Sequence, residues 1–572
     1  MDVVAPAGTR TIARLWRDGV AQEREWPAYL VEQDGDWRAV TWEEAGRRVD
    51  ELANGLLALG VRKGDAFAIL GGTRLEWCLF DFALACVGAV GVGVYMNSSA
   101  KDARYVVEHS DSIGALVEDE AQRAKLEGVE LRHVLTYADL DDLAASGRAY
   151  AAENPGALDE AVNAIGEDDL FTLIYTSGTT GPPKGCMITH RNYYVLVTVV
   201  DRLPQFTLAR DTILLFLPLA HNFGRLMHLG GPYIGYTLAL LGDPLRAAVA
   251  LPQVRPEVFP SVPRFYEKVH GAVLQALEGA SGPKRRVGGW ALRVGYEVSR
   301  LQQAGKPVPP ALAVRHRLAD RLVLSKVRAQ LGGRLRIGFS GGAPLAKEIC
   351  EFFHAVGILV LEGYGLTECT AAVTVNRPDE FRFGTVGPAV PGVELTLADD
   401  GELLIRGETV FAGYFKDPGA TREVLDDDGL LHTGDVAAID ADGFVTITDR
   451  KKDILITAGG KNVAPQNLEN LLKLSPVVSQ VVVVGDRRPF VAALVTLDPA
   501  CGLEPGSDEA RAAVQEAVDT ANAELSRYEQ VKRFRILPRD FSADEGELTP
   551  TLKVRRRIVE QRFAGEIEEL YA

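Results

Sequence analysis

The chain has 572 residues, of which 47% are apolar and 24% are charged, and its formal net charge is −16. This length is enough for two to four folding units, or for one large unit and a smaller one. The strong negative charge would repel a phosphate backbone, so we expect no nucleic-acid partner, although local donors could still bind small anions such as ATP.

The cysteines and the N-terminus bear on where the protein works. Its six cysteines are scattered without CxxC spacing, which predicts neither a metal cluster nor a disulfide framework and favours reduced thiols. The N-terminus has no basic segment followed by an apolar stretch, so we expect no signal peptide. These features together predict a cytoplasmic protein.

The first three quarters of the chain alternate between helical and strand patterns. Residues 42–59 have the spacing of an amphipathic helix, and residues 66–70 form an apolar strand. The apolar segment 77–96 contains an acidic residue and three glycines, so we expect a buried helix over 76–86 and a strand over 89–95 instead of a membrane span. The alternation predicts α/β layers with mostly parallel sheets.

Two later regions differ in character. Residues 281–331 have a mostly helical pattern with a basic cluster and an interruption at Pro307–Pro310, and we expect a solvated helical face there. Further on, short strands alternate with tight Asp-Gly turns. A charged segment then marks a predicted boundary between residues 1–449 and 450–572. The predicted fold class is α/β, with a large multi-layer N-terminal domain of mostly parallel sheets plus a β-barrel-like part, and a small, mobile α+β C-terminal domain.

The most specific motif follows the apolar strand at residues 172–175. Small residues and glycines there would let backbone N–H groups approach a polyphosphate, hydroxyl groups would add donors, and Lys184 would add a positive charge. The motif is not a Walker A loop, because that pattern needs Gly immediately before its Lys and Ser or Thr after it. The full string is Thr176-Ser177-Gly178-Thr179-Thr180-Gly181-Pro182-Pro183-Lys184-Gly185.

This string closely resembles the phosphate loop of the adenylate-forming superfamily, which includes acyl-CoA synthetases, luciferases and peptide-synthetase adenylation domains. Further motifs follow in the family's order, and the resemblance spans about residues 40–560. It is greatest to bacterial long-chain fatty acyl-CoA synthetases. The resemblance implies an enzyme that uses ATP and Mg²⁺ to adenylate a carboxylate and then passes the acyl group to coenzyme A.

Three segments resemble the family's nucleotide site. A strand that ends in paired glycines lets a flat ring lie against the backbone, and Tyr364 can stack on adenine. The carboxylate of Asp435 can accept hydrogen bonds from both ribose hydroxyls, and Arg450 resembles a further ribose contact. The other nucleotide-binding residues implied by the resemblance are Ser177, Gly178, Thr179, Thr180, Gly181, Ser340, Gly341, Gly342, Ala343, Pro344, Glu362, Gly363, Gly365 and Thr367.

The metal and catalytic residues follow from the same motifs. Glu368 supplies a hard carboxylate suited to Mg²⁺, and by resemblance Thr176 binds the same ion. Lys184 would neutralise phosphate charge, and Lys553 resembles the catalytic lysine near the family's C-terminus. His221 would lie near the acyl carboxylate.

Two segments resemble the family's moving parts. Lys452 occupies the position of a hinge about which the small domain rotates, and Gly459, Gly460 and Lys461 resemble a loop that contacts CoA after rotation. Family members often have Glu-Arg shortly after the histidine, where this chain has Gly224-Arg225. That departure leaves the acyl entrance and the chain-length preference open.

Several alternatives remain open at this point. The acceptor could be a separate carrier protein, and the acid could be a medium-chain or aryl carboxylate. A non-catalytic nucleotide- or lipid-binding protein and an oxygen-dependent luciferase are further alternatives, the first disfavoured by Lys184, Glu368, Asp435 and Lys553. Fatty substrates partition into lipid, so peripheral membrane contact is expected without an anchor. The sequence does not specify the oligomeric state.

Overall fold

The computed structural model describes residues 9–33, 35–176, 182–203, 208–542, 545–549 and 553–572. Its first sheet has six strands, all parallel to their neighbours except the last, which pairs antiparallel with the strand before it. In spatial order these strands are β6 (His133–Thr136), β5 (Ser112–Val117), β3 (Ala66–Leu70), β4 (Val90–Val94), β7 (Leu170–Thr176) and β8 (Lys184–Thr189).

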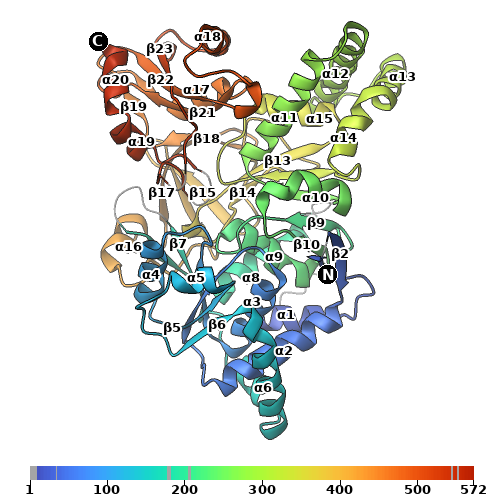
Figure 1. Ribbon diagram of the computed structural model, residues 1–572, viewed down its shortest axis with the longest axis vertical. Coiled ribbons are helices and arrows are strands. Elements are labelled where there is room, and N and C mark those ends of the chain that lie inside the picture. The colour runs from blue at the N-terminus through green and yellow to red at the C-terminus, as the bar shows by residue number, and fades with distance from the viewer. Residues whose placement is uncertain (1–8, 34, 177–181, 204–207, 543–544, 550–552) are drawn as a thin grey trace.

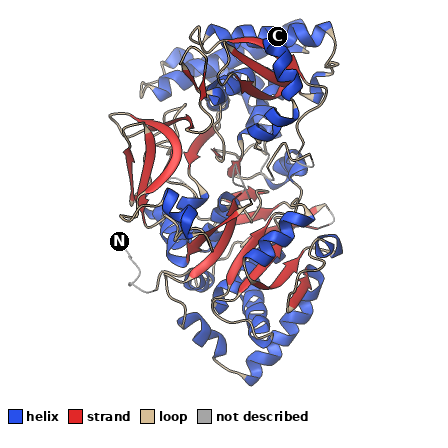
Figure 2. Cartoon of the chain, turned by 90° about the vertical axis from the view of Figure 1, so that its left-hand side faces the viewer, coloured by secondary structure: helices blue, strands red, loops and turns tan. Residues whose placement is uncertain are grey.

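The second sheet has eight strands, and six of them form its parallel centre. Helices cover both sheets, so the strands read as nearly continuous apolar runs (Figure 2). In spatial order the strands are β14 (Thr374–Val375), β13 (Leu359–Tyr364), β12 (Ile337–Ser340), β11 (Val258–Ser261), β9 (Thr212–Leu215), β10 (Thr237–Leu240), β1 (Tyr29–Gln33) and β2 (Asp36–Val40).

The apolar segment near residue 80 is an interior helix followed by a strand, as predicted. Helix α3 (Leu75–Val87) is buried along almost its whole length and ends at Gly88, which has a φ of +73° in the left-handed region that glycine favours. Strand β4 follows directly. Helix α2 (Trp42–Ala58) packs against α3, and its amphipathic pattern matches the predicted helix. Among the described residues, no helix is both long enough and apolar enough to cross a membrane.

The β-rich region after residue 384 forms one antiparallel sheet of four strands. Asp-Gly turns separate its strands, as the turn signals predicted. A short helix, α16 (Pro418–Val424), lies between the second and third strands. The strands are β15 (Val393–Leu397), β16 (Glu402–Gly407), β17 (Leu431–Ile439) and β18 (Val445–Arg450).

The predicted helical region projects from one end of the molecule, beside the C-terminal part of the chain (Figure 1). Its proline-rich interruption falls between α12 and α13, where it was predicted. The helical elements are α11 (Pro263–Glu278), α12 (Gly282–Gln303), α13 (Pro310–Ala319), the π-helical turn η4 (Asp320–Leu324) and α14 (Ser325–Gln330).

The chain after residue 454 builds apolar clusters of its own, distinct from the main core. A small hairpin and a three-stranded sheet with helices make up this region (Figure 1). The Arg264 side chain donates to the Ser479 hydroxyl at 2.7 Å, and Lys473 pairs with Glu267 at 3.1 Å, so both pairs join this region to α11. Its elements are β19 (Leu455–Ile456), β20 (Asn462–Val463), α17 (Pro465–Leu472), β21 (Val478–Val484), β22 (Val491–Leu497), α18 (Asp508–Ala523), β23 (Val531–Ile536), α19 (Arg556–Arg562) and α20 (Ala564–Tyr571).

Candidate active site

The phosphate-loop motif connects two paired strands. Thr176 ends β7 and Lys184 begins β8, and the two residues lie opposite each other in the antiparallel register. The Lys184 ammonium lies 5.0 Å from the centre of the Tyr414 ring, which positions the lysine through a cation–π contact. The motif residues Ser177, Gly178, Thr179, Thr180 and Gly181 lie outside the described residues, so their roles stay predictions.

Glu368 lies in the short turn η5 (Thr367–Cys369) and is half-buried. The Tyr414 hydroxyl donates to its Oε1 at 2.6 Å. Burial and the nearby Glu368 charge raise the pKa of Tyr414, so this hydroxyl stays protonated and remains a donor. The chain before η5 turns sharply at Gly365, where a Cβ atom would lie 1.5 Å from the Ala371 carbonyl oxygen. Only glycine allows the backbone to approach this closely.

The buried Cys186 thiol lies near both predicted metal ligands, Thr176 and Glu368. Burial raises the pKa of this thiol, and the negative charge of Glu368 raises it further, whereas a hydrogen bond with Thr176 lowers it. The backbone of Cys186 also forms an isolated antiparallel β-bridge with the backbone of Tyr414. One carboxylate and one hydroxyl fit Mg²⁺, which takes oxygen ligands and leaves several positions to water and substrate phosphates. Among the described residues, no group of three or more His, Cys, Asp or Glu forms an all-protein metal cage.

Asp435 and its neighbours form a polar cluster that includes the last two strands of the β-rich sheet. Asp435 is only 3% exposed, accepts a 2.5 Å hydrogen bond from Tyr364 and pairs with Arg450 Nε at 3.1 Å. Burial raises the pKa of Asp435, and the Arg450 charge and the Tyr364 hydrogen bond oppose that rise. Strand register brings Asp435 and Arg450 opposite each other. The structure therefore brings together three residues that the motifs placed around the ribose and the adenine.

The adenine-side segment begins where β12 ends at Ser340, opposite Glu362 of β13. The buried Glu362 carboxylate accepts from the Leu345 backbone N–H at 3.0 Å. This hydrogen bond fixes the residue that directly follows the Gly341–Pro344 turn. Burial raises the pKa of Glu362 to about 7. Gly342 has a φ of +84°, and a Cβ atom there would lie 3.8 Å from Lys553 Cε.

His221 caps the helix α9 (Asn222–Ile234). Its Nδ1 accepts from the Phe223 backbone N–H at 3.2 Å, so the proton of the neutral ring lies on Nε2. Burial, and secondarily the Lys553 charge, lower the pKa of His221 to about 3. The ring is therefore neutral at physiological pH and presents an N–H donor.

Lys553 comes from the C-terminal region of the chain. Lys553 is exposed to solvent. Neighbouring protein atoms remove part of the amine's hydration, and together with Arg450 they lower the pKa of Lys553 to about 8, against the opposing charges of Asp435 and Glu368. Because the Lys553 charge also affects His221, these five predicted residues share one electrostatic environment.

The predicted hinge lies just after Arg450, and the predicted CoA loop lies further along the chain. Lys452 is exposed in the turn between β18 and β19, where the Asp453 N–H donates to the Arg450 carbonyl at 2.9 Å. Gly459, Gly460 and Lys461 form the exposed tip between β19 and β20. The Lys461 ammonium lies 6.0 Å from the Tyr528 ring of the same region. In this arrangement, Lys553 lies near the nucleotide-site residues, and the predicted CoA loop contacts Tyr528 of the C-terminal region instead.

Gly224 and Arg225, the departure from the family pattern, have a packing explanation. A Cβ atom at Gly224 would lie 2.5 Å from the Pro218 carbonyl oxygen, so a glutamate does not fit there without a backbone shift. The fully buried Arg225 forms an ion pair with Asp81 and donates to the Thr172 hydroxyl at 2.6 Å. Arg225 thus ties α9, which His221 caps, to α3 and β7.

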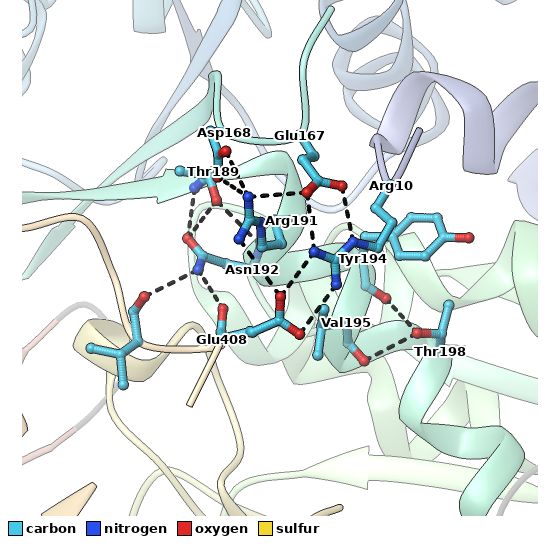
Figure 3. Close-up of polar contacts among 11 residues, drawn as sticks. Arg10, Glu167, Asp168, Thr189, Arg191, Asn192, Tyr194, Val195, Thr198 and Glu408 are labelled. Atoms are coloured by element: carbon cyan, nitrogen blue, oxygen red, sulfur yellow. Dashed lines mark hydrogen bonds and ion pairs between the residues drawn. The ribbon is translucent and has the colours of Figure 1, made fainter. Parts of the chain in front are cut away.

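A polar network that the motifs did not predict joins Arg10, near the N-terminus, to residues around Glu408 (Figure 3). Arg10 and Arg191 lie between Glu167 and Glu408, with ion pairs of 2.9–3.7 Å. Asn192 donates to the Glu408 carbonyl at 2.6 Å. Three residues further on, the Phe411 N–H donates to the Glu368 carbonyl at 2.9 Å. Residues of this network lie up to 398 positions apart in the sequence. No local sequence pattern predicts such a network.

Comparisons with known proteins agree with this geometry. The sequence model of the AMP-binding enzyme matches residues 16–415, and that of the AMP-binding enzyme C-terminal domain matches residues 452–572. The chain is 40% identical to the long-chain-fatty-acid–CoA ligase FadD15 of Mycobacterium tuberculosis, over 96% of this chain and 95% of that protein. It is 30% identical to the long-chain-fatty-acid–CoA ligase ACSBG2 of Xenopus laevis, over 98% and 84%.

Solved structures share the fold. The A-PCP didomain of the carboxylic acid reductase from Segniliparus rugosus, in complex with AMP, superposes with a TM-score of 0.76 at 23% identity, covering 100% of this chain and 83% of that chain. The predicted fold class is thereby confirmed.

Proposed function

Because the chain belongs to the AMP-binding enzyme family, we propose that it is an ATP-dependent long-chain fatty acid–CoA ligase. The main support for this proposal is the position of Lys553 from the C-terminal region. The charges of Glu368, Asp435 and Arg450 influence the pKa of Lys553, and Lys553 influences the pKa of His221. The 40% identity to FadD15 supports the choice of a long-chain fatty acid.

In the first half-reaction, a carboxylate oxygen of the acid attacks the α-phosphorus of ATP. The bond to the bridging oxygen breaks, and pyrophosphate leaves with that electron pair. Two anions must meet, so the protein contributes mainly positioning and positive charge. Lys553 neutralises charge at the α-phosphate, and Lys184 neutralises charge at the leaving phosphates.

Three polar groups orient the substrates. Asp435 accepts from the ribose hydroxyls, and Arg450 maintains the charge of that carboxylate. The neutral His221 ring donates from Nε2 to the acyl carboxylate without adding a charge that would compete with Lys553. Thr176 and Glu368 would hold Mg²⁺, which when bound neutralises phosphate charge.

In the second half-reaction, the C-terminal domain, residues 450–572, rotates about Lys452. Rotation withdraws Lys553 and brings Gly459, Gly460 and Lys461 to the site. The CoA sulfur attacks the acyl carbonyl carbon, the carbon–oxygen bond to the phosphate breaks, and AMP leaves with its electron pair while the thiol proton passes to solvent. One site thus performs both steps through a domain motion.

We place the enzyme in the cytoplasm, in peripheral contact with a membrane that supplies its fatty acid. Its other partners are ATP and CoA. Two alternatives share the same adenylation chemistry. A separate carrier protein could replace CoA as acceptor, or a medium-chain or aryl acid could replace the long-chain acid.

The test is ATP–pyrophosphate exchange with fatty acids of graded length and with aromatic acids, each with and without CoA. We expect exchange to be fastest with long-chain acids and AMP release to require CoA. Fastest exchange with an aromatic acid would contradict the substrate, and AMP release that CoA does not stimulate would contradict the acceptor.

A further inference from the structure

The projecting helices α12 to α14 carry a charge opposite to that of the molecule. Residues 282–330 contain eleven Lys or Arg side chains and two acidic ones, in a protein of net charge −16. Both acids are already paired within the region, Glu297 with Arg315 at 3.6 Å and Asp320 with Arg328 at 2.6 Å. The remaining cations therefore form a concentrated positive surface on an acidic protein.

The same region exposes large apolar side chains in a regular row. Val314 is 63% exposed, Leu318 is 52% exposed and Leu322 is 42% exposed. These residues follow one another at four-residue intervals along α13 and η4, so they lie on one side of the helix. Ala319 and Leu324 on the other side are buried. The exposed row is thus the outer face of a helix that is already anchored to the protein.

Basic side chains accompany the apolar row. Arg317 and Arg321 immediately precede Leu318 and Leu322, and Lys326 follows Leu322 by four residues; all three are exposed. Apolar side chains flanked by Arg and Lys are the arrangement of helices that lie in the interface of an anionic bilayer. We define the arm surface as Val314, Arg317, Leu318, Arg321, Leu322 and Lys326.

We propose that the arm surface docks onto the surface of a membrane that contains anionic phospholipid. The three apolar side chains enter the boundary between headgroups and acyl chains, and the three cations meet the lipid phosphates. A nucleic acid would use the cations but would leave the apolar row in water, and a second copy that met this surface with its own arm surface would place cations opposite cations. A bilayer satisfies both features.

This inference deepens the peripheral membrane contact proposed above. It places the contact on helices that project beside the C-terminal region, at the end of the molecule where that region lies (Figure 1). Docking there brings the enzyme to the phase in which long-chain acids accumulate. Binding is measured without ATP, CoA or acid, so a negative result would leave the ligase assignment untouched.

The experiment is co-sedimentation of the full chain with vesicles. One set contains phosphatidylcholine with about one third phosphatidylglycerol, and the other contains phosphatidylcholine alone. We expect binding to the anionic vesicles that weakens as salt is raised. Absence of binding, or equal binding to both vesicle types, would overturn the proposal.

Two double variants with the same change in charge separate this surface from general effects. Leu318→Ser/Arg321→Gln should reduce the affinity for anionic vesicles about tenfold or more, because it removes one inserted side chain and one cation. The control Leu397→Ser/Arg406→Gln alters a similarly exposed leucine, 41% exposed, and an exposed arginine on the β-rich sheet, and it should bind as wild type. Equal losses in both variants would contradict the assignment of the surface.

Three further readouts make the result specific. Both variants should keep the wild-type melting temperature and the wild-type rate of ATP–pyrophosphate exchange with a short, water-soluble acid. Light scattering and titration with duplex DNA test the other occupants. If Leu318→Ser/Arg321→Gln abolished self-association or DNA binding and left vesicle binding intact, the arm surface would belong to that partner and the proposal would fail.

Discussion

The charge of Lys553 influences the protonation of His221. The positive charge of Lys553 adds to burial in lowering the pKa of His221, and partial desolvation together with the Arg450 charge lowers the pKa of Lys553 to about 8. A neutral imidazole beside a charged amine is the combination that the first half-reaction needs. The lowered pKa also means that Lys553 titrates in a range of pH in which activity can be measured.

We therefore expect kcat/KM for adenylation to fall as the pH rises above about 8, because the Lys553 amine then loses the charge that stabilises the transition state. The profile is recorded by ATP–pyrophosphate exchange. In Lys553→Arg, the residual activity should lose this alkaline decline, since a guanidinium stays protonated. The same decline in Lys553→Arg would assign it to another group.

Tyr414 orients the predicted metal ligand. Tyr414→Phe removes the 2.6 Å hydrogen bond to Glu368, and we expect the Mg²⁺ concentration for half-maximal exchange to rise about tenfold, in line with the loss of a hydrogen bond to a charged group. Tyr233→Phe, which loses a similar bond to Asp201, serves as the control and should need no additional Mg²⁺. An unchanged Mg²⁺ requirement in Tyr414→Phe would remove Tyr414 from the metal site.

At the scale of elements, a buried carboxylate anchors the loop that carries Lys553. Glu547 is fully buried and pairs with Arg539 at 2.7 Å and with Arg562 at 2.9 Å. Its backbone carbonyl accepts from the Arg555 N–H at 2.7 Å, so Glu547 also holds the chain two residues after Lys553. Burial alone would raise the pKa of Glu547, but its hydrogen bonds and the arginine charges lower it to about 2.

Glu547→Gln should destabilise the C-terminal region by about 1–3 kcal/mol, because it leaves buried donors poorly matched. The folded pKa lies below the ordinary value of 4.5, so the carboxylate stabilises the fold above pH 4.5 and this contribution is lost as the pH falls toward 2. The difference in Tm between wild type and variant, followed by calorimetry, should shrink over that range. A pH-independent difference would mean that charge does not hold the loop.

Periodicity predicted the elements well where one local rule dominates. The helix at Trp42–Ala58, the strand at Ala66–Leu70 and the helix α3 that ends at Gly88 all follow from spacing and turn chemistry. Motifs predicted the family, which the match over residues 16–415 confirms. They also placed Lys553 with Asp435, which spacing alone could not have done.

Long-range contacts set the limit of such prediction. Arg225 forms its ion pair with Asp81, 144 residues away, and Gly224 is required by the Pro218 carbonyl that packs against it. Neither feature has a local sequence signal, because each arises where two distant segments meet. The exposed row on α13 was likewise expected only as a solvated face, since its apolar members become visible as a group once the buried side of the helix is known.

At the scale of the whole molecule, two half-reactions at one site require two arrangements of the C-terminal domain. Lys452→Pro should leave ATP–pyrophosphate exchange near the wild-type rate and lower CoA-dependent AMP release at least about tenfold, because proline restricts the backbone rotation at the hinge. Lys452→Ala, which keeps that freedom, is the control. Normal overall turnover in Lys452→Pro would refute the hinge.

The most direct test of one site with two half-reactions is Lys553→Ala, with each half-reaction measured separately. We predict that ATP–pyrophosphate exchange is lost, while thioester formation from supplied acyl-AMP and CoA proceeds at nearly the wild-type rate. Parallel loss of both half-reactions would contradict the assignment of Lys553 to adenylation alone, and with it the rotation that separates the two steps.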